Sequence, residues 1–410
     1  MTMMRGVRRC AGWRANQNVA HGAVFVLRIV SNMRKSLRAK MGIMRLRPYS
    51  ACRATKTKRK LIPPQNQHWT RLHICQLNGT KNYDNKSIVN PTFTAKIIAV
   101  ANLVFVKYNQ HIIYQRSDDM SSILVFPGQG SQAVGMGREL YENNAAARAV
   151  FDEVDDALNQ KLSDIIFNGP MEDLTLTTNV QPAIMATSIA MLRAANVKLS
   201  QYVAGHSLGE YTALCAAGAL SVADTAKLLR LRGDAMQRAV PVGQGLTAVI
   251  LGLDIDVVRD ICAKNDCDVA NDNSPGQVVI SGAREIVEKT LEDAKAAGAK
   301  RAMPLALSVP VHCRIQAPAA EEMRAALAST EIKKPAAALI SNKTCAPISE
   351  PDEIREALVY QITHGVRWRE SVLAMHDLGI TETIEVGPGA VLTGLTKRIC
   401  PEMEGKKLEV

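Results

Sequence analysis

A serine flanked by glycines is the first feature of this chain that could do chemistry. Ser207 follows an apolar run that predicts a strand (YVAG) and precedes a run that predicts a helix (EYTALCAAGAL). A strand, a G-x-S-x-G turn and a helix form a nucleophile elbow, in which the glycines permit a sharp turn and the serine Oγ projects at the carboxyl edge of the sheet. The helix N-terminus offers N–H groups to a developing oxyanion. The alternative is a serine that only caps the helix, and the context favours a nucleophile.

A second glycine-rich turn, FPGQGSQ (Phe126–Gln132), follows the predicted strand SILVF. Its residues also match G-x-G-x-x-A, the fingerprint of a dinucleotide-binding fold. That fingerprint requires a second strand that ends in an acidic residue about 20 residues further on. The corresponding stretch here, NNAAARAVFDEVDDAL, has a helical pattern, so Asp152 and Asp156 are expected on a helix. The nucleotide interpretation therefore fails.

The net charge of +11 is unevenly distributed. Residues 1–119 hold 22 of the 50 Lys+Arg and 3 of the 39 Asp+Glu, which leaves 28 basic and 36 acidic residues from Met120 onward. The body of the protein is acidic, so its basic pI does not indicate a nucleic-acid partner. The apolar piece Ile97–Val106 is too short to cross a bilayer, which needs about 20 apolar residues. We expect neither nucleic acid nor membrane as a partner.

Residues 1–119 are basic, contain serines and have few acids, which is typical of an organelle transit peptide. They show no sustained helical or alternating period, and we favour a misplaced translation start, with Met120 as the true first residue. We predict a cytoplasmic protein, with mitochondrion or plastid as the alternative if the extension is a transit peptide. Nine scattered cysteines without a C-x-x-C pair indicate a reducing, intracellular setting and argue against disulfides or a metal site.

From Met120 onward, short apolar runs alternate with amphipathic stretches, which predicts an α/β fold with a parallel sheet. Residues 245–308 differ, because their pattern reads as a βαββαβ unit and indicates a smaller ferredoxin-like subdomain. Residues 120–244 and 309–400 are expected to form one interrupted core domain. Residues 401–410 are interpreted as a tail.

Six motifs, which occur in a fixed order along the chain, make it resemble a known family. The sequence resembles the malonyl-CoA:acyl carrier protein transacylases of fatty-acid synthesis over essentially all of Met120 to Cys400. The resemblance implies an α/β-hydrolase-like core with a ferredoxin-like insertion, and it covers none of the extension. The motifs are FPGQGSQ, GHSLGEYTAL, LRGDAMQ, NSPGQVVISG, SVPVHC and EVGPGAVLTGLTKRI.

The resemblance implies roles for five residues in catalysis. Ser207 resembles the acylated nucleophile of the family, and His312, in SVPVHC, matches the general base and acid. Gln361, in ALVYQITHGVRW, matches the residue whose carbonyl orients the imidazole, so the third member is not a carboxylate. The oxyanion hole would consist of the backbone N–H groups of Gln129 and Leu208.

The resemblance also implies a pocket for the acyl group. Arg232, in LRLRGDAMQ, matches the arginine that pairs with the malonyl carboxylate, although the residue alone reads as an exposed helix charge. Gln181 and Asn273 resemble pocket-wall positions, and turn formation explains Asn273 nearly as well. We interpret His206 as structural, because a residue adjacent to the elbow serine points elsewhere, and Arg230 as an exposed charge.

The implied reaction is a ping-pong transfer of malonyl from malonyl-CoA to the phosphopantetheine thiol of acyl carrier protein, without metal or redox cofactor, in a protein that we expect to be a monomer. The alternative is a serine thioesterase or hydrolase, which would place Asp or Glu between Ser and His in chain order. Carrier proteins in this pathway are acidic, so docking requires a local basic patch. The candidates, which are otherwise ordinary solvated charges, are Lys300, Arg301, Lys397 and Arg398.

Overall fold

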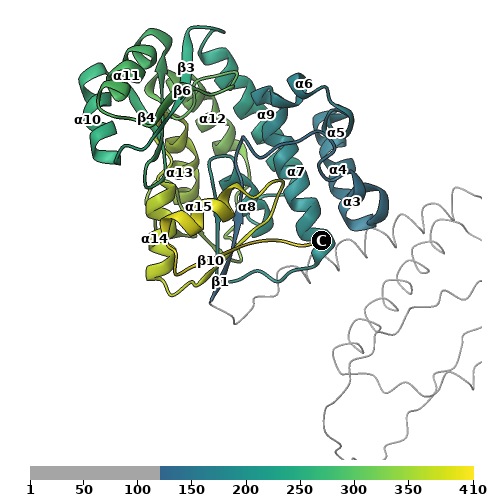
Figure 1. Cartoon of the computed structure of the whole chain (residues 1–410). Helices are drawn as coiled ribbons and strands as arrows, with labels where there is room; N and C mark the ends of the chain where they lie inside the picture. Colours follow the sequence, from purple (N-terminus) through teal and green to yellow (C-terminus); the bar gives the residue numbers. More distant parts are fainter. Residues whose placement is uncertain (1–120) are drawn as a thin grey trace, which may run out of the picture. The chain divides into compact units, whose positions relative to one another are not determined.

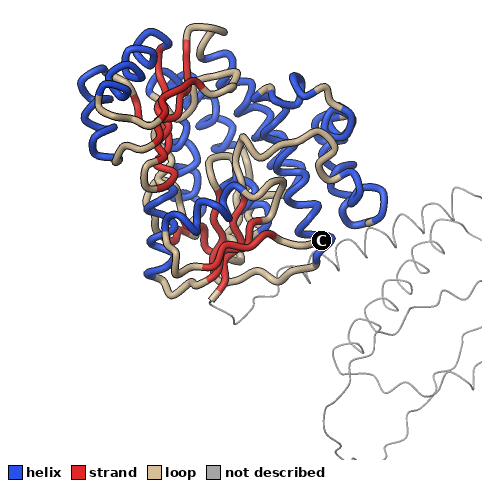
Figure 2. Tube along the Cα trace, viewed as in Figure 1, coloured by secondary structure: helices blue, strands red, loops and turns tan. Residues whose placement is uncertain are grey.

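The computed structural model describes residues 121–410, and the predictions for residues 1–119 lie outside them. A six-stranded sheet in the order β10-β9-β1-β2-β7-β8 organises the larger part of the fold (Figures 1 and 2). All neighbouring strands run parallel except β8, which is antiparallel to β7. The strands are β1 (Ser122–Phe126), β2 (Tyr202–Gly205), β7 (Ala338–Ile340), β8 (Pro347–Ile348), β9 (Glu382–Glu385) and β10 (Glu404–Lys407).

Helices cover both faces of this sheet. Leu124 and Phe126 of β1 join one apolar cluster with α4, α7, α8, α9, α12 and α13, whereas Ile123 and Val125 join a second cluster with α14 and α15. Burial on both faces explains why β1 reads as a continuous apolar run. The helices are α3 (Arg138–Asn143), α4 (Ala145–Leu158), α5 (Leu162–Asn168), α6 (Met171–Thr175), α7 (Thr177–Ala195), α8 (Gly209–Ala216), α9 (Val222–Ala239), η2 (Arg314–Gln316), α12 (Ala317–Ser329), α13 (Pro351–Thr363), α14 (Trp368–Asp377) and α15 (Val391–Ile399).

A separate, wholly antiparallel sheet has the order β4-β5-β3-β6 (Figure 2). Its two helices pack on one face through a cluster that includes Ile250, Val258 and Leu291. The chain order β3, α10, β4, β5, α11, β6 is the predicted βαββαβ pattern. The elements are β3 (Gly245–Leu251), α10 (Ile255–Asn265), β4 (Asp268–Ser274), β5 (Gln277–Ala283), α11 (Arg284–Ala296) and β6 (Arg301–Pro304).

Strand β4 ties the small sheet to the rest of the protein. A parallel bridge joins Asn271 to Val366, just before α14. Arg369 in α14 donates to both carboxylate oxygens of Asp272 at 2.8–3.0 Å, and Asp272 is buried. A buried bidentate pair of this kind fixes both distance and orientation. The small sheet is therefore held against the elements that carry the site described below.

Two local expectations need correction. The stretch NNAAARAVFDEVDDAL, for which we predict a helical pattern, is divided: α3 ends at Asn143, and the Asn144 side chain caps α4 by accepting from the N–H groups of Ala146 and Ala147. The predicted tail, residues 401–410, contains β10, which pairs in parallel with β9. Its sequence, EGKK, is mostly exposed and lacks the apolar pattern of a strand, so only its backbone pairing identifies it.

In the part of the chain that the structure describes, we found no helix with the length and apolar character that a bilayer span requires.

Candidate active site

Ser207 occupies the predicted turn between β2 and α8 in a strained backbone conformation. Its φ angle is 56°, in the left-handed region that few residues other than glycine adopt. The flanking glycines are required by close approach: a Cβ on Gly205 would lie 1.9 Å from the carbonyl carbon of Gly209, and a Cβ on Gly209 would lie 2.2 Å from the carbonyl oxygen of Phe126. The strand–turn–helix geometry of a nucleophile elbow is thus present.

Asn342, which the sequence analysis missed, braces this turn from the neighbouring strand. It follows β7 by two residues, and its amide accepts from the N–H of Ser207 at 3.0 Å and donates to the carbonyl of Gly205 at 2.8 Å. One side chain thus satisfies two backbone groups that the tight turn leaves unpaired. The only signal in the sequence was a polar stretch, SNKT, after an apolar run.

His312 lies against the serine. Its Nε2 is 2.8 Å from Ser207 Oγ, and its Nδ1 is 2.5 Å from the backbone carbonyl of Gln361 in α13. Since a carbonyl only accepts, Nδ1 carries the proton and Nε2 is free to accept the serine hydroxyl. Burial, with Arg232 as the second cause, lowers the pKa of His312 to about 3, so the ring is neutral at pH 7. The arrangement is that of a hydroxyl nucleophile and its general base.

The backbone N–H groups expected to form the oxyanion hole, those of Gln129 and Leu208, belong to two different turns. Leu208 precedes α8, and Gln129 lies in the loop after β1. This loop packs closely on the elbow, because a Cβ on Gly128 would be 2.8 Å from the carbonyl oxygen of His206. Within residues 121–410 neither N–H has a hydrogen-bond acceptor. Both remain free to bind an oxyanion, as the resemblance implies.

Arg232 is buried beside the serine and lacks a counter-ion. Its side chain on α9 is 2% exposed, and its Nη2 lies 3.2 Å from Ser207 Oγ. Its other acceptors are the amide oxygens of Gln181 and Gln361, each at 2.7 Å. No Asp or Glu of residues 121–410 forms an ion pair with it, and its Nε has no partner there. The interpretation of Arg232 as an exposed charge is therefore excluded.

A buried guanidinium without a carboxylate is costly. Burial lowers the pKa of Arg232, and the nearby Tyr211 and Glu210 oppose that shift. The guanidinium carbon also lies 5.9 Å from the centre of the Tyr211 ring, a cation–π distance. Such a cost is offset when a ligand supplies the missing negative charge. The site is therefore suited to a substrate with an anionic group close to the carbon that Ser207 attacks.

Gln361 and Glu210 form a second layer beneath these groups. The side-chain Nε2 of Gln361 donates to Glu210 Oε2 at 2.5 Å and, more weakly, to the carbonyl of Ser207 at 3.2 Å. Glu210 is fully buried in the first turn of α8, and its Oε1 accepts from the N–H of Asn342 at 2.7 Å. The sequence analysis missed Glu210, because an acid in the first turn of a helix is ordinary.

Two further residues, Asn273 and Arg230, differ from their expected surroundings, whereas His206 does not. Asn273 lies in β4 and not in the turn that follows it, and its Oδ1 is 2.9 Å from Nε2 of His206. His206 therefore contacts the small sheet, and no hydrogen bond joins it to Ser207 or His312, in agreement with a structural role. Arg230 is not freely exposed: it is half-buried and donates to Asn179 of α7 at 3.0 Å, because α9 packs along α7.

The predicted docking residues form two basic pairs near one end of the small sheet. Lys300 directly precedes β6 and Arg301 begins it, and Lys397 and Arg398 lie in the last turn of α15. Arg301 pairs with Leu251, and Leu251 pairs with Gln277, so the three side chains point to the same face. Arg398 donates to Gln277 Oε1 at 2.8 Å. Two strand spacings, about 10 Å, separate Gln277 from Arg301. Arg398, bound to Gln277, therefore lies on the same face of the sheet as Arg301, two strands away.

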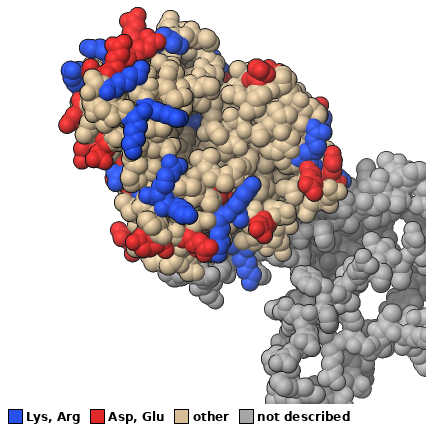
Figure 3. All heavy atoms as spheres, viewed as in Figure 1, with Lys and Arg blue, Asp and Glu red and all other residues tan. Residues whose placement is uncertain are grey.

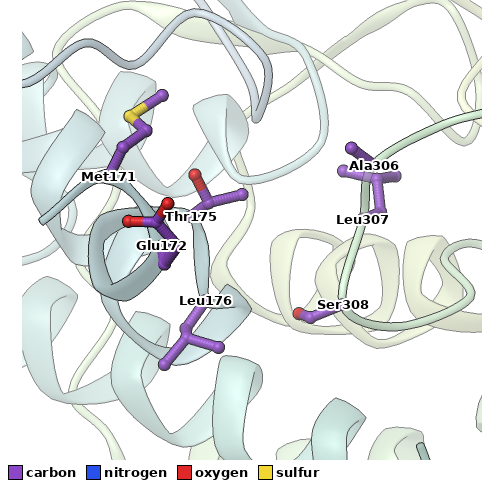
Figure 4. Close-up of a pocket in the computed structure, with 7 residues that line it drawn as sticks. All are labelled: Met171, Glu172, Thr175, Leu176, Ala306, Leu307 and Ser308. Carbon is purple, nitrogen blue, oxygen red and sulfur yellow. The ribbon is translucent and has the colours of Figure 1, made fainter.

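A pocket of about 350 Å³ lies between α6 and the segment before His312 (Figure 4). The elements around it continue into the site, because α7, which carries Gln181, begins one residue after Leu176, and His312 follows Ser308 by four residues. The N–H of Thr177 donates to Ser308 Oγ at 3.3 Å. The residues that line this pocket are Met171, Glu172, Thr175, Leu176, Ala306, Leu307 and Ser308.

Comparison with known proteins gives the same picture. The acyl transferase domain family matches residues 123–409. The malonyl CoA-acyl carrier protein transacylase of Bacillus subtilis (strain 168) is 46% identical over 288 residues, which are 68% of this chain and 91% of that protein. The crystal structure of an acyl-carrier-protein-S-malonyltransferase from Bartonella henselae is 47% identical and superposes with a TM-score of 0.69, covering 71% of this chain and 96% of that one.

A third relative was solved together with its partner. It is a malonyl-transacylase in complex with a type II PKS acyl-carrier protein, 40% identical, with a TM-score of 0.68 and coverage of 70% of this chain and 95% of that one. These relatives share a mixed α/β fold with a parallel and a separate antiparallel sheet. The chain belongs to the acyl transferase domain family and, within it, to the malonyl-CoA:acyl carrier protein transacylases.

Proposed function

We propose that this protein transfers the malonyl group of malonyl-CoA to the phosphopantetheine thiol of acyl carrier protein in fatty-acid biosynthesis. The observation that carries the proposal is the buried guanidinium of Arg232, which has no counter-ion among residues 121–410 and lies 3.2 Å from Ser207 Oγ. In a malonyl ester of Ser207 only a methylene separates the ester carbonyl from a carboxylate. That carboxylate reaches the guanidinium, and a bidentate pair satisfies both charges.

In the first half-reaction, Ser207 Oγ attacks the thioester carbonyl of malonyl-CoA and His312 Nε2 takes the hydroxyl proton. The N–H groups of Gln129 and Leu208 stabilise the oxyanion that forms. The C–S bond then breaks, and His312 returns the proton to the sulfur of coenzyme A. The product is a malonyl ester on Ser207, and the charge of Arg232 is paired throughout.

The second half-reaction runs the same steps in reverse. The phosphopantetheine thiol of the carrier protein gives its proton to His312 Nε2, its sulfur attacks the ester carbonyl, and the Oγ–C bond breaks. His312 returns the proton to Oγ. The two substrates and the residues of this chain supply every group that the scheme uses, so the scheme needs no further cofactor. A hydrolase would follow the same first step and release free malonate, but the relatives of this chain are transacylases.

Mass spectrometry of the acyl-enzyme tests the proposal directly. Brief incubation with malonyl-CoA alone is expected to add one malonyl group to the peptide that contains Ser207, and Ser207→Ala is expected to remain unlabelled. Addition of carrier protein bearing phosphopantetheine is expected to discharge the enzyme and yield malonyl-carrier protein. Label on a cysteine peptide, or release of malonate as the main product, would contradict the proposal.

The division into domains belongs to the same proposal. Residues 120–244 and 309–400 are assigned to an α/β-hydrolase-like core, supported by a parallel sheet with helices on both faces and a serine at its carboxyl edge. Residues 245–308 are assigned to a ferredoxin-like subdomain, supported by the βαββαβ order and the strand order β4-β5-β3-β6. The core assignment is extended to residues 401–410 because of β10.

The basic end of the small sheet is assigned to carrier-protein docking. Its support is the convergence of Arg301 and Arg398 on one face of that sheet. In Figure 3, basic side chains extend from the region of the small sheet toward the region of α15. An acidic partner gains from such a patch in encounter rate and orientation.

The proposal also includes a monomeric state and a cytoplasmic location, with an organelle as the alternative. The scattered distribution of the cysteines supports a reducing compartment. Sedimentation of the purified chain tests the monomer, and imaging of a tagged full-length chain tests the compartment.

A further inference from the structure

Glu210 is a buried ionisable group beside the site that the mechanism above does not use. Glu210 is fully buried, and burial raises the pKa of its carboxyl group to about 7. Its carboxyl oxygens accept from the N–H of Asn342 at 2.7 Å and from Nε2 of Gln361 at 2.5 Å, and the Ser341 hydroxyl is a further hydrogen-bonding neighbour. Burying a carboxylate costs free energy that an apolar residue would not, so a reason for its presence beyond packing is required.

That reason lies in the orientation of the Gln361 amide. In its carboxylate form Glu210 can only accept, so the end of Gln361 that faces this form is its NH₂ group. The opposite end, Oε1, is thereby turned toward Arg232 and accepts from Nη2 at 2.7 Å. Nη2 is also the nitrogen that lies 3.2 Å from Ser207 Oγ. A continuous chain of hydrogen bonds thus runs from Glu210 through Gln361 and Arg232 to the attacking atom.

We propose that Glu210 is a positioning residue for acyl selectivity: its carboxylate fixes the amide of Gln361, and that amide holds the guanidinium of Arg232 where a malonyl carboxylate meets it. The inference rests on the proposed function, since it explains how the acyl pocket of that reaction is built. Glu210 contacts neither the serine Oγ nor His312, so its effect reaches the substrate only through other side chains.

Glu210→Gln tests this arrangement because it preserves shape and removes one acceptor. The backbone N–H of Asn342 cannot turn away, so the new amide keeps its oxygen there and presents NH₂ to Gln361. Gln361 must then turn its own oxygen toward residue 210 and its NH₂ toward Arg232, which sets two donors against each other. The guanidinium is expected to leave its position, whereas the contact between Ser207 Oγ and His312 Nε2 is expected to remain.

The experiment compares kcat/KM for acylation by malonyl-CoA and by acetyl-CoA in the full-length enzyme. In Glu210→Gln the malonyl-to-acetyl ratio is expected to fall roughly ten- to a hundredfold, mainly through a higher KM for malonyl-CoA. Glu210→Asp, which keeps both acceptors on a shorter side chain, is expected to recover part of the ratio. In an Arg232→Ala background, Glu210→Gln is expected to change the ratio no further.

Glu385→Gln is the matched control. Glu385 is also a fully buried glutamate, and its oxygens accept from the N–H groups of Leu392 at 3.2 Å and Thr393 at 2.8 Å, at the start of α15. Its substitution removes an acceptor from a buried network that contains no site residue. It is expected to lower the melting temperature and to leave the malonyl-to-acetyl ratio unchanged.

Three results would overturn the inference: an unchanged ratio in Glu210→Gln, an equal loss for both acyl-CoAs, or a higher ratio. The last would mean that Glu210 acts only by charge, because removal of a nearby anion strengthens the attraction between Arg232 and malonyl. If Glu210→Gln does not fold, the ratio in Glu210→Asp decides, and the wild-type value contradicts the inference. Failure of the proposed function is recognised separately, since the wild-type enzyme would then not be malonylated on Ser207.

Discussion

The guanidinium of Arg232 lies 3.2 Å from the Oγ of Ser207, and its other hydrogen-bond acceptors are the neutral amides of Gln181 and Gln361. A positive charge is thus stored in the interior, next to the atom that attacks. A substrate that brings its own carboxylate pairs this charge, whereas an uncharged acyl group leaves it unpaired. This contact joins the catalytic atom to the selection of the acyl group.

Arg232→Ala is expected to lower kcat/KM for malonyl-CoA by roughly a hundred- to several-thousandfold, because breaking a buried charge pair costs about 3–5 kcal/mol. Acetyl-CoA is expected to lose far less, or to gain, since no unpaired guanidinium remains. Arg232→Lys is expected to recover only part of the malonyl activity, because an ammonium group lacks the two parallel donors. An equal loss for both acyl-CoAs would show that Arg232 is structural.

Asn342→Ala, unlike Arg232→Ala, is expected to slow acylation by malonyl-CoA and acetyl-CoA to the same extent. The substitution leaves the N–H of Ser207 and the carbonyl of Gly205 without partners, so the elbow loses its brace. Acylation is expected to fall by about tenfold or more for malonyl-CoA and acetyl-CoA alike. The acylation rate for each substrate, measured in single turnovers, checks this. A loss confined to malonyl-CoA would place Asn342 in acyl recognition instead.

The sequence predicted the parts of this protein whose signals are local. The elbow at Ser207 and the βαββαβ order follow from glycines, apolar periodicity and turn residues along the chain. Glu210 and Asn342 are 132 residues apart, and nothing in either neighbourhood indicates that they meet. Strand β10 was missed for a related reason, since an exposed EGKK segment becomes a strand only through its pairing with β9.

Packing between helices far apart in the chain also explains why Arg230 was wrongly predicted to be exposed. Arg230 and Arg232 lie two residues apart on a single helix, and the sequence by itself offers the same interpretation for both. Packing of α9 against α7 half-buries Arg230 and turns Arg232 fully inward. The resemblance to a known family singled out Arg232, which the structure buries, whereas Arg230 kept the interpretation of an exposed charge, which the structure corrects.

Replacement of Lys300 and Arg301 by Glu is expected to raise the KM for carrier protein, and most strongly at low salt, where exposed charges are least screened. Acylation by malonyl-CoA alone is expected to stay unchanged, because the two residues lie at the start of β6, and within residues 121–410 no backbone hydrogen bond joins them to the catalytic or acyl-pocket residues. The two half-reactions are measured separately. Equal losses in both would indicate that the patch binds the phosphates of coenzyme A or supports the fold.

A chain that begins at Met120 is expected to keep its activity and its melting temperature. Every residue assigned to the site lies between Gln129 and Arg398, and the strands of both sheets described above lie within residues 121–410. Activity assays and thermal unfolding of the shortened and full-length chains provide the comparison. An insoluble or inactive short chain would make the extension part of the fold, and import of the tagged full-length chain into an organelle would favour a transit peptide.

The stability of the protein is expected to fall in mild acid because of His312. Burial and the charge of Arg232 lower the pKa of His312 to about 3, below its ordinary value of 6.5, so the unfolded chain takes up a proton that the folded protein does not. The stability that this group contributes is complete above pH 6.5 and is lost as the pH falls toward 3. At pH 5 the loss amounts to about 2 kcal/mol, at 1.36 kcal/mol for each pH unit.

Urea unfolding at pH 7 and pH 5 measures this loss. The wild-type protein is expected to lose about 2 kcal/mol more between the two values than His312→Asn, whose side chain does not titrate. Glu210, whose raised pKa acts in the opposite direction, is present in both proteins and cancels. If His312→Asn follows the wild-type curve, His312 is protonated in the folded protein at pH 5, and Nε2 is then not the free acceptor that the serine requires.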